Sequence, residues 1–251
     1  MASVALESVA NSSGLRPAPE THNGCSACPA RVLSVCGALP ANDVGAVSAV
    51  VSHRRASAGD TLLNEGDKAD SVLNIIDGTV KVYKLLPDGR RQITGFLHPG
   101  DLLGLAYDNA YTASAEALTP VRYCVYPRRQ FERLLDGSRP MEKFLLARVS
   151  NELIAAQEQM VMLGRKTAQE KIASFLVMLF DRTKRNSRLS DRMVVPMTRA
   201  DIADYLGLTT ETVSRCFTRL KDRGMIELCA GGKVRIPDLE GLRLLASGAE
   251  N

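Results

Sequence analysis

The segment from residue 197 to residue 223 constrains this chain most, because it reads as two short helices joined by a glycine turn. Thr198 can cap the first helix, and Gly207 supplies a tight break after it. Thr209 or Thr210 can cap the second helix, whose apolar stripe is formed by Val213, Phe217 and Leu220. This pattern predicts a helix-turn-helix, a motif that places its second helix in the major groove of DNA.

The polar side of that second helix carries side chains that can contact DNA, namely Thr210, Glu211, Ser214, Arg215 and Arg219. Arginine can bind guanine through two hydrogen bonds, glutamate can accept one from cytosine, and serine can reach a base edge or a phosphate. Residues 226–228 and 234–236 flank Gly231-Gly232 and predict a hairpin that would form a wing beside the helices. An ordinary helical hairpin with a solvated face is the alternative, which the motif disfavours.

The size and charge of the chain are compatible with a DNA-binding protein of two domains. It has 251 residues and a formal net charge of +4, which permits nucleic acid as a partner without requiring it. Its apolar runs are too short to span a bilayer, and its first residues do not resemble a secretory signal. We therefore expect a cytoplasmic protein without membrane contact. Three histidines, no plausible triad and no glycine-rich phosphate loop argue against an enzyme.

Six cysteines in a cytoplasmic chain indicate metal, cluster or thiol chemistry rather than a disulfide framework. Cys25 and Cys28 form a C-x-x-C pair, and Cys36 follows after seven intervening residues. This spacing can bring three sulfurs to one ion or cluster, and a fourth can come from Cys124, Cys216 or Cys229. The spacing does not choose between zinc and an iron–sulfur cluster, and scattered reduced thiols are the alternative.

The middle of the chain has the sequence pattern of a β domain. From His53 to about residue 125, short apolar runs alternate with turn pairs such as Asp77-Gly78 and Asp88-Gly89. Residues 79–85 alternate between apolar and polar side chains, as in a strand. Many short strands at this spacing predict a β-roll or jelly roll.

A long helix is predicted from about Pro140 to Gly164. Its apolar residues recur at alternating steps of three and four, which is the pattern of a heptad seam. A seam this narrow fits a helix that pairs with its own copy, so we expect a homodimer; a helix packed on its own domain is the alternative. The seam consists of Leu146, Val149, Leu153, Ala156, Met160 and Leu163.

The order of β-roll, long helix and winged helix-turn-helix resembles the CRP/FNR superfamily of bacterial transcription regulators, over roughly residues 22–245. The most specific pieces are residues 211–215 (Glu-Thr-Val-Ser-Arg), residues 92–96 (Gln-Ile-Thr-Gly-Phe) and the cysteines. Within the superfamily the chain resembles the FNR branch of oxygen-responsive regulators.

The resemblance implies an α+β fold with an N-terminal β-roll sensor domain of the jelly-roll, cyclic-nucleotide-binding-like type, a long dimerisation helix and a C-terminal winged helix-turn-helix. The domains expected on this basis are a flexible tail (1–22), the cysteine loop with the β-roll (23–138), the dimerisation helix (139–165) and the DNA-binding domain (166–245).

The resemblance also implies a cofactor and partners. In the FNR branch an N-terminal cysteine group and one cysteine of the β-roll hold a [4Fe–4S] cluster, and the matching residues here are Cys25, Cys28, Cys36 and Cys124. It implies a homodimer that controls anaerobic or microaerobic genes, contacts RNA polymerase and binds an inverted repeat of double-stranded DNA with half-sites like TTGAT. Arg215 would read the guanine, Glu211 the opposite strand, and Ser214 a thymine or a phosphate.

Three features depart from the best-known members. The gap of seven residues between Cys28 and Cys36 is longer, and the basic pair Arg90-Arg91 replaces an acidic residue in the loop expected to touch RNA polymerase. Ala156 stands where those members carry an acidic residue that keeps cluster-free monomers apart. Because two carboxylates in a low-dielectric seam would repel each other, we expect dimerisation here to depend less strictly on the cluster.

Other regulator types remain as alternatives. A cyclic-nucleotide sensor needs a Gly-Glu pair and then an Arg-Ser pair in the β-roll, but here Leu105 follows Gly104 and the next arginine is Arg122. A phosphate would lack a cationic partner, so we expect no cyclic nucleotide. Two alternatives stay open: a cluster-free regulator that is always active or controlled by thiol oxidation, and a protein whose cysteines hold a structural zinc.

Overall fold

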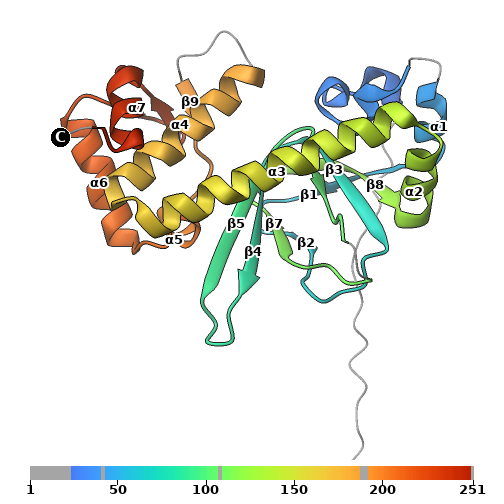
Figure 1. Cartoon of the computed structure of the whole chain (residues 1–251), viewed down its shortest axis with the longest axis horizontal. Helices are drawn as coiled ribbons and strands as arrows, with labels where there is room; N and C mark the ends of the chain where they lie inside the picture. Colours follow the sequence, from blue (N-terminus) through green and yellow to red (C-terminus); the bar gives the residue numbers. More distant parts are fainter. Residues whose placement is uncertain (1–23, 41–42, 107–108, 187–191, 250–251) are drawn as a thin grey trace, which may run out of the picture.

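The computed structural model describes residues 24–40, 43–106, 109–186 and 192–249, so the tail predicted for residues 1–22 lies outside the described residues. A cysteine loop and a β-roll come first, a long helix follows, and a helical domain with a small sheet completes the described chain (Figure 1). The predicted α+β fold with a jelly-roll domain, a long helix and a winged helix-turn-helix is confirmed.

Two four-stranded antiparallel sheets form the β-roll. The first has the order β1-β8-β3-β6, with β1 Ser52–Ala56, β8 Val121–Pro127, β3 Ser71–Asp77 and β6 Leu102–Leu103. The second has the order β2-β7-β4-β5, with β2 Thr61–Leu63, β7 Ser114–Ala117, β4 Val80–Leu85 and β5 Arg91–Leu97. Buried side chains of both sheets form the roll core, which includes Leu63, Leu73, Ile75, Val80, Tyr123 and Val125.

The cysteine loop packs on the other face of the first sheet. It contains three short 3-10 helices and is followed by a short α-helix: η1 Cys25–Ala27, η2 Arg31–Leu33, η3 Val35–Ala38 and α1 Val44–Ser48. Because side chains alternate along a strand, Val72 and Ile76 of β3 face this loop while Leu73 and Ile75 face the roll core. The 3-10 helices were not predicted.

Helix α2 (Arg128–Asp136) leads into the long helix α3 (Arg139–Arg165). Ser138 caps α3, since its hydroxyl oxygen accepts a hydrogen bond from the Met141 amide. The helix runs from the cysteine loop, past the β-roll, to the C-terminal domain (Figure 1). It therefore touches each of the other parts of the described molecule.

The C-terminal domain combines four helices with a three-stranded sheet. The helices are α4 Ala168–Asn186, α5 Arg199–Leu206, α6 Thr210–Asp222 and α7 Leu239–Ser247. The sheet has the order β10-β11-β9, with β10 Glu227–Cys229, β11 Lys233–Arg235 and β9 Arg192–Val194. The predicted hairpin is the β10–β11 pair, whereas the pairing of β9 with it was not predicted.

An aromatic group and an ion cluster join the C-terminal domain to the β-roll. Phe96 of β5 lies 5.1 Å from Tyr205 of α5 and 6.1 Å from Phe175 of α4 between ring centroids. Beside these rings, five charged residues form what we call the interdomain ion cluster: Lys81, Arg91, Glu116, Asp201 and Asp204. Within the described residues, no helix is both long and apolar enough to cross a membrane.

Candidate DNA interface, dimer seam and cysteine site

Helix α5 begins at a complete capping box. The Thr198 hydroxyl oxygen accepts a hydrogen bond from the Asp201 amide at 3.0 Å, and the Asp201 carboxylate accepts one from the Thr198 amide at 3.0 Å. Gly207 ends the helix with φ +62°, a left-handed conformation that glycine adopts without strain. These local signals set the turn between α5 and α6.

Helix α6 presents every predicted DNA-contact residue to solvent. Thr209 caps it by accepting from the Thr212 amide at 3.2 Å. Its opposite side is buried through Val213, Cys216, Phe217 and Leu220. The exposed side holds Thr210, Glu211, Ser214, Arg215 and Arg219.

Three further interactions bear on how α6 would meet DNA. The Arg199 guanidinium lies 3.3 Å from the centre of the Phe217 ring, so a cation–π contact joins α5 to α6. The backbone amide at the start of α6 and the Thr209 hydroxyl lower the pKa of Glu211, which keeps this carboxylate ionised as an acceptor. The Ser214 hydroxyl donates to the Thr210 carbonyl at 2.9 Å, so its lone pairs remain available to a donor on DNA.

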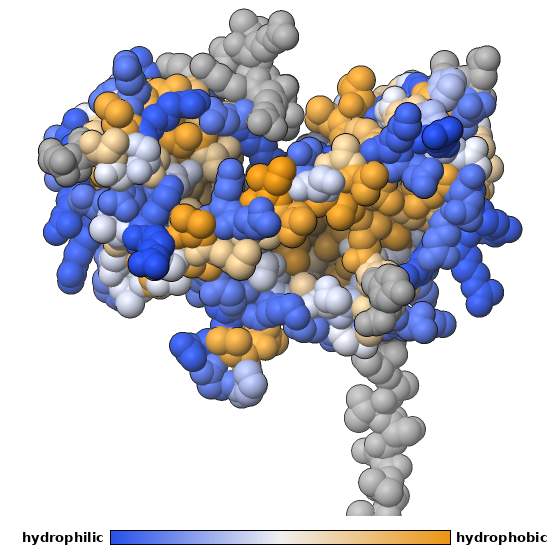
Figure 2. Space-filling view, in the orientation of Figure 1, coloured by the Kyte–Doolittle hydropathy of each residue, from blue (hydrophilic) through white to orange (hydrophobic). Residues whose placement is uncertain are grey.

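The predicted seam on α3 is largely open to solvent in the single chain. Leu146 is 67% exposed, Leu153 61% and Met160 65%, while Leu163 is half-buried. Apolar side chains gather along α3 in the space-filling view (Figure 2). Ile154 and Val161 are also exposed and widen this stripe. They were missed, although their spacing of seven residues follows the heptad period.

The four predicted cluster ligands come together from distant parts of the chain. Cys25, Cys36 and Cys124 are buried in one hydrophobic cluster, and Cys28 packs against it. Cys124 lies on β8 next to β3, and the others belong to the loop that covers this face. Cys216 and Cys229 lie in the C-terminal domain, outside this group.

Burial dominates the acidity of these thiols. It raises the pKa of Cys124 far above its ordinary value, and the negative charges of ionised Cys28, Cys36 and Cys25 would raise it further. Burial also raises the pKa values of Cys25 and Cys28. The Cys36 sulfur lies 2.8 Å from the Tyr126 hydroxyl. A positively charged metal centre is the kind of group that would stabilise several thiolates here.

The thiols are gathered but not arranged around a single ion. Among the side chains that the structure describes, no group of three or more His, Cys, Asp or Glu residues could hold a metal ion as it stands. A [4Fe–4S] cluster binds each thiolate to a different iron, so its ligands need not converge on one point. The chemistry of the four sulfurs fits such a cluster, and the assignment stays a prediction.

Comparison with known proteins identifies the family. The family model described as "Cyclic nucleotide-binding domain" matches residues 53–138, and "Crp-like helix-turn-helix domain" matches residues 170–245. The "Transcriptional activatory protein AadR" of Rhodopseudomonas palustris is 41% identical over 91% of this chain and 93% of its own length. The "Nitrogen fixation regulation protein FixK" of Bradyrhizobium diazoefficiens is 41% identical over 83% of this chain and 88% of its own.

The chain belongs to the CRP/FNR family of transcription regulators. A solved CRP/FNR structure, that of FixK2 from Bradyrhizobium japonicum, superposes with a TM-score of 0.72 at 33% identity, covering 78% of this chain and 97% of that one. The predicted superfamily is thus confirmed. These relatives are regulators rather than enzymes, which agrees with the expectation drawn from the sequence.

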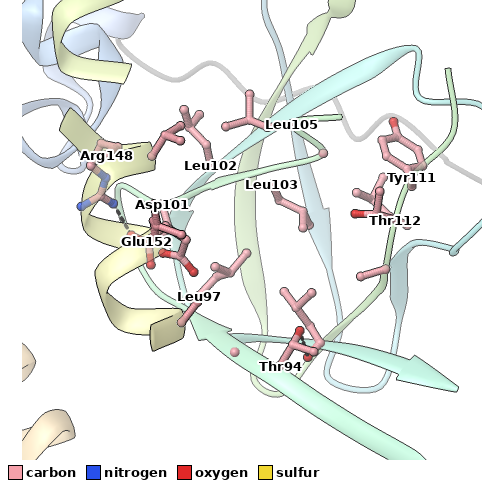
Figure 3. A pocket seen from close by; sticks show the side chains of 18 residues that line it. Thr94, Leu97, Asp101, Leu102, Leu103, Leu105, Tyr111, Thr112, Arg148 and Glu152 are labelled. Carbon is pink, nitrogen blue, oxygen red and sulfur yellow. Dashed lines mark hydrogen bonds and ion pairs between the residues drawn. The ribbon is translucent and has the colours of Figure 1, made fainter. Parts of the chain in front are cut away.

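In this CRP/FNR regulator a cavity of about 490 Å³, partly open to solvent, lies between the β-roll and α3. Leu63, Leu97, Leu103, Tyr111 and other apolar side chains form most of its wall (Figure 3). Arg148 of α3 also lines it, but its guanidinium is paired with the Asp101 carboxylate. Three seam residues, Val149, Leu153 and Ala156, form part of the same wall.

Sequence reasoning missed the residues that join the parts of this CRP/FNR regulator. Asp101 of the turn before β6 forms ion pairs with Arg148 of α3 and with Arg182 of α4. Lys81 and Asp201 stand 120 residues apart in sequence, yet the Lys81 ammonium lies 3.2 Å from the Asp201 carboxylate. No local pattern marks such pairs, because they depend on how the domains dock.

Proposed function

We propose that this CRP/FNR regulator is an oxygen-responsive transcription activator that works as a homodimer. One observation carries the proposal: four cysteines from two distant segments gather at the beginning of the long helix, three of them buried and Cys28 partly buried. The cluster that contains them also includes Met141, and Phe144 and Leu145 pack against it. A structural change at the cysteines would therefore alter the packing around the beginning of α3.

The cysteines fit the role of cluster ligands. Cys25, Cys28 and Cys36 would bind from the loop, and Cys124 would bind from β8. Such ligation joins the loop to the β-roll, so that binding energy also becomes folding energy. A [4Fe–4S] cluster would supply iron that reacts with oxygen. Loss of the ligated state would release the loop from the sheet.

The loop has a second connection to the rest of the molecule. Leu33 lies against Gly100, where an added Cβ would come within 2.5 Å of the Leu33 Cβ. The next residue, Asp101, is the one that pairs with Arg148 of α3 and Arg182 of α4. The cysteine loop, the dimer helix and the DNA-binding domain therefore all contact one turn of the β-roll, at Gly100 and Asp101.

The exposed stripe of α3 is the proposed dimer contact, formed by Leu146, Val149, Leu153, Ala156, Met160 and Leu163. Ala156 carries no charge, so the proposed dimer depends less strictly on the cluster than it would with a carboxylate there. A two-fold dimer presents two copies of α6 about one DNA turn apart, which predicts an inverted repeat as the target. The TTGAT-like half-site and the contact with RNA polymerase are part of this proposal.

In the proposed complex, Arg215 donates two hydrogen bonds to guanine and Glu211 accepts from cytosine on the opposite strand. Ser214 contacts a thymine or a phosphate, and Thr210 and Arg219 flank these contacts on the exposed side of α6. We further propose that no cyclic nucleotide controls the protein. The cavity supports this view, since the arginine in its wall is already paired with Asp101. The regulator would act in the cytoplasm, where bacterial DNA lies.

The test is to purify the full chain without oxygen, measure iron and visible absorbance, and then follow DNA binding before and after exposure to air. We expect about four irons per chain, visible absorbance from thiolate-bound iron, and loss of both colour and DNA binding in air. A colourless protein that contains zinc or no metal and binds DNA equally well in air would refute oxygen sensing. It would leave the DNA-binding role intact and favour the structural-zinc or thiol-controlled alternatives.

A further inference from the structure

The cysteine site contains a buried polar residue that neither the fold nor the ligand set explains. Asn74 of β3 is 1% exposed, and among the described residues its Oδ1 atom has no hydrogen-bond partner. Burying a polar group without a partner is unfavourable, so such a residue calls for an explanation.

The strand register shows where this side chain lies. Asn74 is paired directly with Cys124 of β8 on one side and with Leu102 of β6 on the other. Its neighbours at i−2 and i+2, Val72 and Ile76, belong to the hydrophobic cluster that contains the cysteines. Because side chains on a strand alternate between faces, Asn74 lies on the face of the sheet that carries the cysteines.

Cys124 is the only sulfur-bearing residue among these four neighbours on the sheet. Directly opposed residues of antiparallel strands have Cβ atoms about 5 Å apart, which is within the reach of an amide. An asparagine amide also has two N–H donors, and rotation about its last bond exchanges its nitrogen and oxygen positions. With its nitrogen turned toward Cys124, the amide would donate a hydrogen bond to a thiolate there; the oxygen itself cannot pair with a thiolate, because both are acceptors.

We propose, building on the function proposed above, that Asn74 is a positioning residue for the iron–sulfur cluster: its amide donates a hydrogen bond to the sulfur of Cys124 when that thiolate binds iron. The donor stabilises negative charge on a buried sulfur, whose residue is paired on its other side with His53 of β1. Hydrogen bonds to ligand sulfurs are a general means by which proteins tune such clusters. The residue would thus set how long the cluster survives in oxygen.

The proposed role predicts that replacing Asn74 affects the lifetime of the cluster but not the stability of the cluster-free chain. A residue with only a structural role would change both together. Without the cluster, Asn74 is a polar group without a partner at Oδ1, so replacing it by an apolar residue should leave the cluster-free protein equally stable or more stable. With the cluster, the same replacement removes a hydrogen bond to Cys124. The stability of the cluster-free chain and the lifetime of the cluster should therefore not fall together.

The experiment uses the full chain with Asn74→Leu, which keeps the branching at Cγ, and Asn74→Ala, which avoids any steric clash. Two quantities are measured: the half-life of visible absorbance in air-saturated buffer and the melting temperature of chelator-treated, cluster-free protein. Ser114→Ala is the matched control, because Ser114 is a buried polar residue of the other sheet whose hydroxyl accepts from the Glu65 amide.

We expect both Asn74 variants to lose their absorbance about tenfold faster than the wild type, or to be purified without iron. Their cluster-free forms should melt no lower than wild type, while Ser114→Ala should lower the melting temperature and keep the wild-type half-life. A wild-type half-life in both Asn74 variants would overturn the inference, as would a shorter half-life accompanied by a lower melting temperature. A wild-type protein without iron would instead refute the proposed oxygen sensor itself.

Discussion

Replacing Asp201 by asparagine tests the interdomain ion cluster most directly. Asp201 is 3% exposed and serves two structures at once. Within α5 its carboxylate accepts from the Thr198 amide, and across the domain boundary it lies 3.2 Å from the Lys81 ammonium. The asparagine variant can keep the cap through its amide oxygen but loses the charge that faces Lys81.

The expected loss follows from the surroundings of Lys81. Removing one partner from a buried ion pair costs about 3–5 kcal/mol. Lys81 keeps a second partner, since the Glu116 carboxylate lies 2.8 Å away. We therefore expect a smaller loss than this range, about 2–3 kcal/mol of unfolding free energy. For a chain of this size the melting temperature should fall by about 5–10 °C.

Asp204→Asn is the matched control on the same helix. Its carboxylate pairs with Arg91 at 3.0 Å, but both side chains are about one-third exposed, so this pair should contribute about 1 kcal/mol or less. Differential scanning calorimetry at neutral pH compares the three proteins. An Asp201→Asn variant that melts no lower than Asp204→Asn would refute the reasoning.

The pH dependence of the same variant has a defined sign. Burial alone would raise the pKa of Asp201, but hydrogen bonds from Thr198 and the charge of Lys81 outweigh it, so the pKa lies below its ordinary value. A carboxyl with a lowered pKa stabilises the fold above its unfolded-state pKa of about 4, and this contribution is lost as the pH falls further. The difference between wild type and Asp201→Asn should therefore be full at neutral pH and shrink in acid.

Three other predictions concern DNA, the loop and the dimer. Arg215→Ala should cost about 1–3 kcal/mol of binding and abolish the preference for guanine at one position of each half-site; competition binding with substituted operators checks this, and an unchanged preference contradicts it. Gly100→Ala should lower the free energy of unfolding by about 1–3 kcal/mol, because the new Cβ would clash with Leu33 and because glycine alone tolerates φ +92° well. An unchanged melting temperature would argue against the contact between Gly100 and Leu33. Leu153→Glu should yield monomers in sedimentation experiments, whereas Leu244→Glu, an equally apolar exposed site on α7, should not.

The cysteine site shows where inference from sequence stopped. The C-x-x-C pair and Cys36 mark a thiol site by their spacing, but spacing left three candidates for the fourth ligand. The structure places Cys124 with the other three and leaves Cys216 and Cys229 in another domain. The family resemblance pointed to Cys124, and the packing of the loop on β8 and β3 explains physically why this cysteine can join the others.

Asn74 shows the same limit of inference from sequence. A polar residue within the apolar run Val-Leu-Asn-Ile-Ile is visible in the sequence, and it could have been noticed as an exception. Its meaning depends on the register that pairs it with Cys124, which is a property of the sheet.

Sequence alone determined the parts whose signals act over one or two helical turns or one hairpin. The Thr198 cap, the Gly207 turn, the exposed side of α6, the wing hairpin and the apolar stripe of α3 all follow from spacings of two to four residues. Tertiary structure decided which of those parts contact each other. Segments far apart in the chain are joined by the gathering of the four cysteines, by the Lys81–Asp201 pair, and by the ion pairs of Asp101 with Arg148 and Arg182. Their energies depend on burial and on docking geometry, which exist only once the domains have packed.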